Sequence, residues 1–446
     1  MLKSVFFISL GCDKNLVDSE EMLGMLVDHG YTITDEEDKA DVIVINTCCF
    51  IHDAKEESIQ AILEMAEYKK SGNCQFLLVT GCMAQRYREE IVQEIPEVDA
   101  VLGTTSYEKI LEALEKAGSE PYLKFQDISY LPQVDSRRVI TTGGHFEYLK
   151  IAEGCDKHCT YCIIPKLRGN YRSVPMERLL EQAAYLAEQG VKELILVAQE
   201  TTLYGTDLYG RKCLHVLLQR LCEIPGIRWI RLQYCYPEEI YDDLITVMRE
   251  EKKICHYLDL PIQHASDEVL KRMGRRTNKQ QLIEIVEKLR REIPDIILRT
   301  TLITGFPGET QKQHEELMEF VDRMEFDRLG VFTYSQEEDT PAAMMPDQIP
   351  EEVKEDRQAE LMELQQEISL EKGDRRIGQL LEVMIQGKVA DENAYVGRTY
   401  ADAPNVDGYI FINTDTQLMS GDFAKVVVTG ALEYDLIGEL EDEYTE

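Results

Sequence analysis

Three cysteines with the spacing C-x-x-x-C-x-x-C lie in the stretch Glu153-Gly-Cys-Asp-Lys-His-Cys-Thr-Tyr-Cys162. A structural zinc site needs four closed ligands, and no histidine follows at the spacing that would complete a zinc finger. Three thiolates on one short loop are typical of an iron–sulfur cluster in which one iron stays open for a small molecule. We therefore predict that Cys155, Cys159 and Cys162 hold such a cluster. The alternative is a structural metal site that takes its fourth ligand from elsewhere in the chain.

A second set of cysteines follows strand-like runs in the N-terminal part of the chain. Cys12, Cys48 and Cys82 come just after apolar runs at residues 5–9, 42–46 and 76–80. If these runs are neighbouring parallel strands, their carboxyl ends meet at one edge of the sheet, where ligands bind. The three thiols would then converge, so we predict a second metal site there. The alternative is that they are ordinary buried thiols, which is a common fate of cysteine.

Residues 1–120 alternate between strand and helix patterns, and this alternation must position the second set of cysteines. The strand runs alternate with amphipathic stretches, which lie at residues 16–27, 53–68, 84–94 and 107–116. The alternation predicts an N-terminal α/β domain with a doubly wound parallel sheet, whose fourth strand is residues 100–102. Residues 121–140, which include two prolines, are interpreted as a linker.

Residues 141–372 repeat the alternation and contain the first set of cysteines. The predicted strands lie at residues 146–152, 193–198, 229–233, 257–260, 296–301 and 328–332. Six β/α units predict a partial (β/α)6 barrel whose active site lies at the carboxyl ends of the strands. The loop of Cys155 follows the first strand and so belongs to that end. A polar helix at residues 351–372 is expected to brace the barrel, with an apolar side made of Val353, Leu361, Leu364 and Ile368.

Residues 373–446 change to short strand patterns separated by Gly, Pro and Asp, at residues 380–386, 392–398, 408–412 and 424–428. This pattern predicts a small antiparallel β-barrel. Residues 375–446 contain fourteen Asp or Glu and only five Lys or Arg. Because phosphate contacts are made by Lys and Arg, this composition disfavours tRNA as a partner of the barrel.

The whole chain is strongly acidic, with a net charge of −35 over 446 residues. An acidic enzyme is better matched to a basic protein than to a phosphate-rich partner. No apolar run approaches the roughly 20 residues that span a bilayer, so no membrane association is expected. The twelve cysteines occur without an export signal, which indicates a reducing, cytoplasmic location where thiols are available for metal.

Polar residues at the predicted strand ends are candidates for binding a small molecule. The spacing of the three clustered cysteines, with Tyr161 before the last of them, resembles that of the radical S-adenosylmethionine (SAM) enzymes, in which SAM completes the open iron. An Arg or Glu at the strand ends could hold the amino acid part of SAM, and a Gln its ribose. In addition to Tyr161, the candidates for binding SAM are Gln199, Glu200, Gln263 and Arg299. The alternative is that these residues have structural roles, and Glu200, for example, would then cap a helix.

Taken together, two cysteine triplets and a terminal β-barrel resemble the methylthiotransferase family of radical SAM enzymes. The resemblance covers nearly the whole chain and rests on these stretches: Ile8-Ser-Leu-Gly-Cys12, Asn46-Thr-Cys48, Gly81-Cys82, Cys155–Cys162 with Ile163-Ile-Pro-Lys-Leu-Arg-Gly169, Asp259-Leu-Pro-Ile-Gln-His264, Gly305-Phe-Pro-Gly-Glu-Thr310, and a tail similar to a TRAM domain. It implies a radical SAM methylthiotransferase with two [4Fe-4S] clusters and SAM as cofactors. Cys155, Cys159 and Cys162 would be its catalytic cluster ligands.

Within the family, Lys14-Asn-Leu-Val-Asp-Ser-Glu20 is similar to the RimO branch, which modifies an aspartate of small-subunit ribosomal protein twelve. The MiaB-type branches, which modify tRNA adenosines, usually carry Gln-Met-Asn there and remain the alternative. Asp13 departs from the branch, which often has Pro. The resemblance implies that a radical derived from SAM removes hydrogen from the aspartate β-carbon. Sulfur would come from the second cluster, the methyl group from a second SAM, and electrons from a reducing electron-transfer protein.

Overall fold

The structure of the protein, a computed structural model, describes residues 3–116, 118, 120–134, 137–390 and 392–444. Residues 135 and 136 of the predicted linker lie outside this part of the chain. The chain divides into two compact units. Unit 1 contains Met1–Thr141, Lys150–Val174 and Ser335–Ala343, and unit 2 contains Thr142–Leu149, Pro175–Tyr334 and Met344–Glu446. The loop that carries Cys155, Cys159 and Cys162 therefore belongs to the same unit as the N-terminal sheet.

Unit 1 is built on a parallel sheet with the strand order β2-β1-β3-β4-β5-β6. The predicted strands are present as β1 (Ser4–Ser9), β3 (Val42–Thr47), β4 (Phe76–Gly81) and β5 (Ala100–Leu102). Two edge strands, β2 (Thr32–Ile33) and β6 (Tyr122–Lys124), were not predicted, because β2 is exposed and β6 is half-buried, so neither forms a buried apolar run like that of β5. Since β6 pairs with β5, part of the predicted linker belongs to the sheet.

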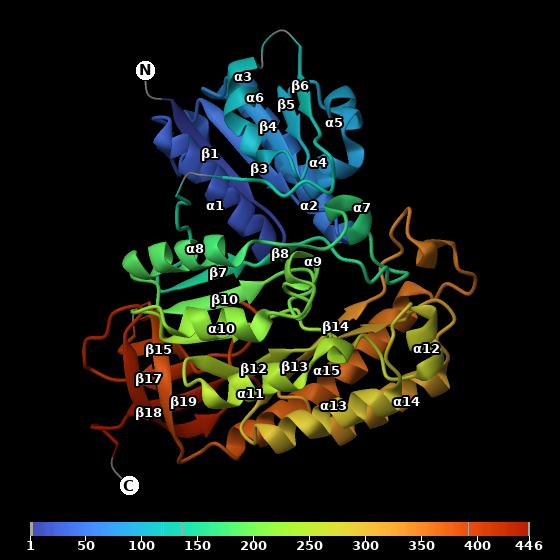
Figure 1. Cartoon of the computed structure of the whole chain (residues 1–446), viewed down its shortest axis with the longest axis vertical. Coiled ribbons are helices and arrows are strands. Elements are labelled where there is room, and N and C mark those ends of the chain that lie inside the picture. The colour runs from blue at the N-terminus through green and yellow to red at the C-terminus, as the bar shows by residue number, and fades with distance from the viewer. Residues whose placement is uncertain (1–2, 117, 119, 135–136, 391, 445–446) are drawn as a thin grey trace. The chain divides into compact units, whose positions relative to one another are not determined.

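Helices cover this sheet, as the blue and cyan part of Figure 1 shows. Their bounds are α1 (Asp13–Asp28), η1 (Glu37–Lys39), α2 (His52–Ala66), α3 (Tyr68–Ser71), α4 (Cys82–Tyr87), α5 (Glu89–Glu94), η2 (Tyr107–Lys109) and α6 (Ile110–Lys116). The single helix predicted at residues 84–94 is divided into α4 and α5, because Arg88 has a φ of 46° that helical backbone cannot adopt.

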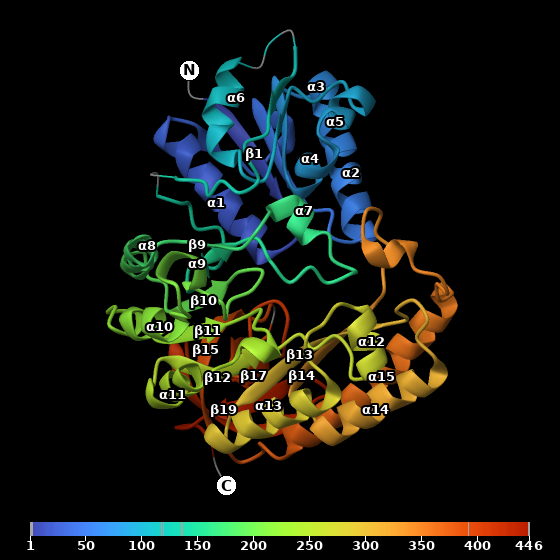
Figure 2. The same ribbon diagram turned by 45° about the vertical axis from the view of Figure 1, so that its right-hand side comes forward.

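The cysteine loop in unit 1 contains β8 (Ala152–Glu153), α7 (Ile164–Arg168) and β9 (Arg172–Ser173). The antiparallel pair β8–β9 closes the loop at its base. At the other end, α7 lies against α4 of the N-terminal sheet, and both Figure 1 and Figure 2 show this contact. The loop is thereby held at two places, its base and α7.

Unit 2 contains the second sheet, with the strand order β14-β13-β12-β11-β10-β7. All six predicted strands are present, as β7 (Phe146–Lys150), β10 (Glu193–Val197), β11 (Trp229–Leu232), β12 (Ile254–Asp259), β13 (Ile297–Thr304) and β14 (Arg328–Thr333). The pairs from β10 to β14 are parallel, as a partial barrel requires. The helices are α8 (Met176–Glu188), α9 (Thr206–Tyr209), α10 (Leu214–Cys222), η3 (Pro237–Glu239), α11 (Asp242–Glu250), α12 (Asp267–Arg272), α13 (Lys279–Glu292) and α14 (Gln311–Met324). The short helix η4 (Pro341–Met344) follows β14 and falls almost wholly in the segment Ser335–Ala343 of unit 1.

Two of these helices begin where the sequence supplies complete capping boxes. Asn278 accepts a hydrogen bond from the backbone of Gln281, whose side chain accepts one from the backbone of Asn278 in return. Thr310 and Gln313 form the same reciprocal pair at the start of α14. Each box satisfies two backbone N–H groups that would otherwise have no partner. The helices α13 and α14, which come after β12 and β13 in the chain, therefore begin at defined residues.

The predicted bracing helix is α15 (Glu351–Asp374), which Figure 2 shows beside α14. Of its predicted apolar side, Leu361 and Ile368 are buried and Leu364 is half-buried, but the start of the helix differs. Val353 is exposed, whereas Lys354 and Arg357 are buried because they bond to the Tyr334 carbonyl and the Glu309 carboxylate. Hydrophobic periodicity does not detect a helix face that is buried through hydrogen bonds.

The C-terminal strands close into a barrel with the order β15-β16-β17-β19-β18. The strands are β15 (Leu380–Lys388), β16 (Ala394–Arg398), β17 (Ile410–Asn413), β18 (Phe423–Ala431) and β19 (Leu436–Leu440). The predicted barrel is confirmed, with two differences. The last strand, β19, was not predicted, and it pairs in parallel with β17, while the other pairs are antiparallel. No helix in the described residues is long and apolar enough to cross a membrane.

Candidate metal centres and cofactor site

The N-terminal cysteines lie at the carboxyl ends of three neighbouring strands, as the sequence predicts. Cys12 follows β1 as the N-cap of α1, Cys48 follows β3, and Cys82 follows β4 as the first residue of α4. Because β1, β3 and β4 are adjacent in the sheet, the three residues share one edge. The side chain of Asn15 ties two of these ends together, since its Nδ2 donates to the carbonyls of Leu10 (2.9 Å) and Thr47 (3.0 Å).

Glycine before the cysteine allows the close approach of these loops. Gly11 has a φ of 88°, and a Cβ placed on it would lie 2.8 Å from the Sγ of Cys48. Gly81, just before Cys82, has a φ of 93°, and its Cβ would lie 2.3 Å from the Asn46 side chain. A positive φ and so little space permit only glycine. Both Gly-Cys dipeptides belong to the stretches that carry the family resemblance, and the structure gives the physical reason for the glycine.

The thiols of this set influence one another electrostatically. Burial, together with the neighbouring Cys82 thiol, raises the pKa of the Cys48 thiol to about 12. Burial also raises the pKa of Cys82, while the Arg168 guanidinium opposes that rise through its charge and a hydrogen bond. Buried thiols that repel one another as thiolates are suited to a positive metal centre, which stabilises the thiolate form.

The loop of Cys155, Cys159 and Cys162 is held by its own backbone and by its neighbours in unit 1. The N–H of Cys155 donates to Gly169 O (3.0 Å) and that of Cys162 to Cys159 O (3.0 Å). The segment Ser335–Ala343 contacts the loop, because Ala342 N donates to Thr160 O (2.9 Å). Cys155 and Cys159 are buried, and Cys162 is partly exposed. A loop that is fixed and partly exposed is suited to hold an iron–sulfur cluster that binds a small molecule.

A buried ionic network lies between this loop and helix α1. Arg168 contacts Asp18 (2.8 Å) and Glu153 (3.2 Å), and Lys150 contacts the same two carboxylates. Asp18 belongs to the stretch that resembles the RimO branch. Arg168 also donates to the Asn15 side chain. The stretch therefore connects the cysteine loop to the N-terminal sheet instead of lying on the surface.

The thiols fit iron–sulfur clusters better than single metal ions. Among the described residues, no three His, Cys, Asp or Glu side chains are close enough together to hold one ion. In an iron–sulfur cluster each thiolate binds a different iron, so the thiols need not converge on one point. The chemistry of the donor set, with three thiols in each triplet, agrees with that assignment.

Gln263 of unit 2, one of the predicted SAM contacts, lies beyond the end of β12. It forms a single bridge to Leu302 with a φ of 72°, and its Oε1 atom is buried without a hydrogen-bond partner among the described residues. The Oε1 atom of Gln233, directly after β11, is in the same situation. Two unsatisfied buried amide oxygens at adjacent strand ends are suited to a polar ligand. Gln233 was missed, although it follows its strand as closely as Gln199 does.

Two other predicted contacts already have protein partners. Glu200 is fully buried, and its Oε1 accepts a hydrogen bond from Thr202 N (2.9 Å) in a turn, whereas the next helix, α9, begins only at Thr206. Arg299 lies near the start of β13, away from its carboxyl end, and pairs with Asp259 (2.8 Å) and Asp407 (3.4 Å). Two carboxylates therefore already neutralise this guanidinium.

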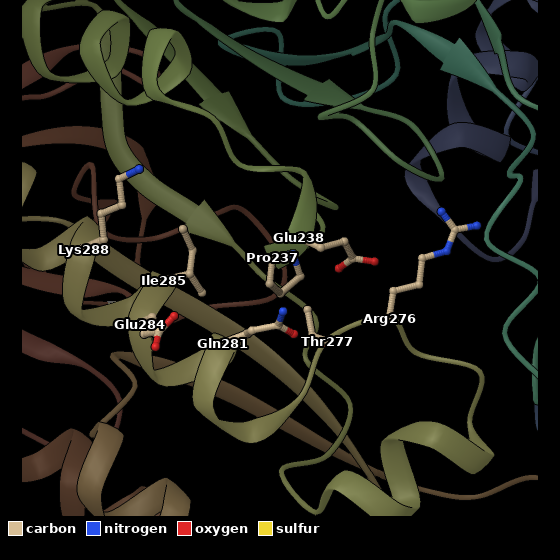
Figure 3. Close-up of a pocket in the computed structure, with 8 residues that line it drawn as sticks. All are labelled: Pro237, Glu238, Arg276, Thr277, Gln281, Glu284, Ile285 and Lys288. Atoms are coloured by element: carbon tan, nitrogen blue, oxygen red, sulfur yellow. The ribbon is translucent and has the colours of Figure 1, made fainter.

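A separate pocket of about 290 Å³ lies between the segment after β11 and helix α13, and Figure 3 shows its lining. The lining residues are Pro237, Glu238, Arg276, Thr277, Gln281, Glu284, Ile285 and Lys288. Arg276 points away from the other side chains in this view. None of the predicted cofactor residues lines the pocket.

Three family models match the chain. An uncharacterized protein family, UPF0004, matches residues 4–103, the radical SAM superfamily residues 149–321, and the TRAM domain residues 377–440. A protein of Lachnoclostridium phytofermentans named ribosomal protein uS12 methylthiotransferase RimO is 66% identical over 438 residues, which cover 98% of this chain and 100% of the relative. The chain belongs to the RimO family.

Other members of the RimO family agree with this assignment. Proteins of the same name from Desulforamulus reducens and Clostridioides difficile are each 49% identical, over 98% and 97% of this chain and 100% and 97% of theirs. As a RimO family member the chain is a radical SAM methylthiotransferase that uses an iron–sulfur cluster and SAM. The MiaB-type alternative is not favoured.

The fold also resembles a solved radical SAM structure. The chain aligns with the radical S-adenosylmethionine methyltransferase TsrM from Kitasatospora setae, determined with cobalamin and a [4Fe-4S] cluster bound. The TM-score is 0.55 at 12% sequence identity, over 89% of this chain and 77% of that one. This likeness supports the α/β fold of this RimO family member.

Proposed function

We propose that this chain inserts sulfur and a methyl group at the β-carbon of an aspartate in ribosomal protein uS12, giving 3-methylthioaspartate. The observation that carries the proposal is the identity of 66% to a relative of that name over 98% of the chain. The two cysteine triplets within unit 1 supply the ligands that such chemistry needs. The β-carbon hydrogen of aspartate is too weakly acidic for a side-chain base near neutral pH.

Two clusters are part of this proposal. Cys155, Cys159 and Cys162 would hold the cluster that serves SAM, and a second would lie on the N-terminal cysteines, Cys12, Cys48 and Cys82. When bound, the reduced cluster supplies one electron for the cleavage of SAM, chemistry that can remove hydrogen from an unactivated carbon. The chain itself fixes the thiols, buries them and orients the loops that carry them.

Iron analysis tests the count of clusters. The reconstituted chain should bind about eight irons if both sites hold four-iron clusters. Replacing Cys155, Cys159 and Cys162 together by Ala should halve the iron and abolish SAM cleavage. Replacing the N-terminal triplet should also halve the iron but leave SAM cleavage detectable. Full iron retention after either triple change would contradict the assignment.

For SAM itself, we propose contacts from Gln199, Glu200, Gln263 and Tyr161, with Gln233 as an addition. Gln263 is the sharpest test because its Oε1 atom is buried and unsatisfied. Replacing it by Leu should weaken SAM binding in equilibrium dialysis about tenfold, which corresponds to about one hydrogen bond. Gln280→Leu, on the exposed side of α13, is the matched control and should leave binding unchanged. Arg299 stays a predicted contact, but its two carboxylate partners give no support to that role.

The substrate is proposed to be the basic ribosomal protein, free or in the ribosome, and not tRNA. Several acidic side chains of the barrel are exposed, among them Glu392, Asp415 and Glu433. Two other acidic residues of the barrel, Asp402 and Asp407, are buried in ion pairs and do not contribute to the surface. Asp391 and Glu446 lie outside the described residues. An acidic surface attracts cationic protein and repels phosphate.

Replacing Glu392, Asp415 and Glu433 by Lys should slow association with uS12, most strongly at low salt because exposed charges are screened by added ions. The measurement is the association rate of purified enzyme with uS12 and with tRNA at matched ionic strength. Tighter binding to tRNA that leads to methylthiolation would overturn the choice of substrate. The electron-transfer protein and the cytoplasmic location remain predictions.

The decisive experiment compares a deletion strain with its parent by mass spectrometry of ribosomal protein and tRNA. The proposal predicts loss of the methylthio mass from the uS12 peptide and an unchanged set of tRNA nucleosides. Loss of a methylthio group from tRNA, with uS12 unaffected, would replace the proposal by the MiaB-type function.

A further inference from the structure

Arg168 is a fully buried cation at the end of α7, in the same unit as both cysteine triplets. Its guanidinium pairs with Asp18 at 2.8 Å and with Glu153 at 3.2 Å. A buried ion pair costs desolvation energy and is weak evidence for stability alone. We therefore expect Arg168 to have a role in addition to holding α7 in place.

The first indication of that role is geometric. Arg168 Nη2 donates to the side chain of Asn15. Asn15 in turn donates to the carbonyl of Leu10, two residues before Cys12, and to that of Thr47, directly before Cys48. Arg168 thus fixes the amide that holds two of the three cysteine-bearing strand ends together.

The second indication is charge. Arg168 and Lys150 together balance Asp18 and Glu153. Arg168 differs from Lys150 because it also faces the N-terminal thiols. Its guanidinium lies within hydrogen-bonding reach of the Cys82 thiol. The ammonium of Lys150, by contrast, lies over the Tyr107 ring, 5.5 Å from its centre.

We propose that Arg168 is a positioning residue for the N-terminal iron–sulfur cluster, which it serves in two ways. Through Asn15 it fixes the loops of Cys12 and Cys48, and it places a buried positive charge beside the cluster's thiolates. The inference rests on the proposed function, because it requires a cluster on the N-terminal cysteines. Mutation of residues that orient or hydrogen-bond the ligands of a metal typically changes metal affinity 10- to 100-fold.

Two consequences follow from this role. Without the positive charge, the more negative reduced state of the cluster is less stable, so the midpoint potential falls. Without the fixed Asn15 amide, the loops of Cys12 and Cys48 separate more readily, so the cluster loses iron faster. Neither consequence requires turnover, so both are measurable in a chain that holds only this cluster.

The test uses the full chain with Cys155, Cys159 and Cys162 replaced by Ala, so that only the N-terminal cluster remains. In this parent, Arg168→Gln should lower the midpoint potential in a titration followed by electron paramagnetic resonance. It should also speed the loss of iron to a chelator about tenfold. Lys150→Gln is the matched control, because it removes a cation from the same two carboxylates, and it should shift the potential less.

Arg168→Lys separates charge from geometry and serves if Arg168→Gln does not fold. It keeps the charge but lacks the planar fork, so the potential should stay near that of the parent while iron is lost faster. Parent-like potential and iron retention in Arg168→Gln, or equal shifts in Arg168→Gln and Lys150→Gln, would overturn the inference. So would parent-like iron retention in Arg168→Lys. A parent that binds no iron would instead refute the proposed second cluster.

Discussion

At the scale of single residues, glycine decides how closely the cysteine loops approach each other. Gly11 combines a φ of 88° with a position where a Cβ would lie 2.8 Å from Cys48 Sγ. An L-residue pays roughly 1–2 kcal/mol for the left-handed backbone alone. The contact between this Cβ and the sulfur of Cys48 adds a steric cost, and Cys48 is a predicted cluster ligand.

Replacing Gly11 by Ala should therefore cost the chain its N-terminal cluster. We expect about half the iron of the unsubstituted chain after reconstitution, with SAM cleavage retained. Gly190→Ala is the matched control, since Gly190 has a φ of 100° but open space around its Cβ position. It carries the same backbone strain and should keep all its iron. Equal iron in the two variants would show that the Cys48 contact has no influence.

At the scale of elements, the turn between β13 and α14 is held by a buried carboxylate. Glu309 accepts a hydrogen bond from the backbone of Phe306 (3.1 Å) and pairs with Arg357 of α15 (3.1 Å). The ring of His264 lies beside this group, with its Nε2 3.9 Å from Glu309. Its Nδ1 accepts from Ser266 N, so the ring is held in the neutral form.

This neutral histidine should make the stability of unit 2 sensitive to acid. Burial lowers the pKa of His264 to about 3, and the neighbouring His314 and Arg272 add to that effect. The unfolded chain takes up the proton below its ordinary pKa of about 6.5, whereas the folded chain does not until about pH 3. Stability is therefore lost as the pH falls through this window, by about 1 kcal/mol between pH 6.5 and 5.5.

His264→Gln should remove that part of the pH dependence. The measurement is the urea midpoint at pH 7 and at pH 5.5, followed by the fluorescence of Trp229, the single tryptophan of the chain, which lies in β11 of the same unit. The midpoint of the variant should change less between the two pH values than that of the unsubstituted chain. An identical change in both proteins would contradict the role of His264.

At the scale of the whole molecule, the TRAM barrel is joined to the central sheet of unit 2 by buried charges. Glu193 of β10 pairs with Arg231 of β11 (2.7 Å) and with Arg398 of β16 (2.6 Å). Asp407 accepts a hydrogen bond from the Tyr257 hydroxyl (2.7 Å). Glu193 is the first residue of β10, and Asp407 also pairs with Arg299 near the start of β13. The barrel is therefore part of the packing of unit 2 and not an independent appendage.

Glu193→Gln should strongly destabilise this junction, because it leaves two buried guanidinium groups without their carboxylate. Breaking a buried pair in this way costs about 3–5 kcal/mol. Glu382→Gln is the matched control, since the Glu382–Arg228 pair joins the same two parts but is exposed, and such pairs contribute about 0–1 kcal/mol. Trp229, whose ring lies 4.9 Å from that of Phe423 in the barrel, reports the junction by its fluorescence. Similar urea midpoints for the two variants would contradict the account.

The sequence by itself determined the features that local patterns encode. Cysteine spacing marked the loop of Cys155, and the positions after strand-like runs marked the N-terminal triplet. Apolar runs located every strand of the central sheet, because side-chain chemistry and strand periodicity are properties of neighbouring residues. The edge strands β2 and β6 of the N-terminal sheet were missed because they are not buried, so their residues form no apolar run. The fold class was thus predictable, whereas the iron–sulfur roles of the six cysteines stay predictions.

Only the tertiary structure decided which distant residues meet. The pairing of Arg168 with Asp18 spans 150 residues and that of Arg398 with Glu193 spans 205. Sequence periodicity tells which face of an element is buried but not which partner lies against it, so a buried charge and its counter-charge cannot be matched in advance. For that reason the sequence placed Arg299 at the cofactor, whereas the fold pairs it with two carboxylates.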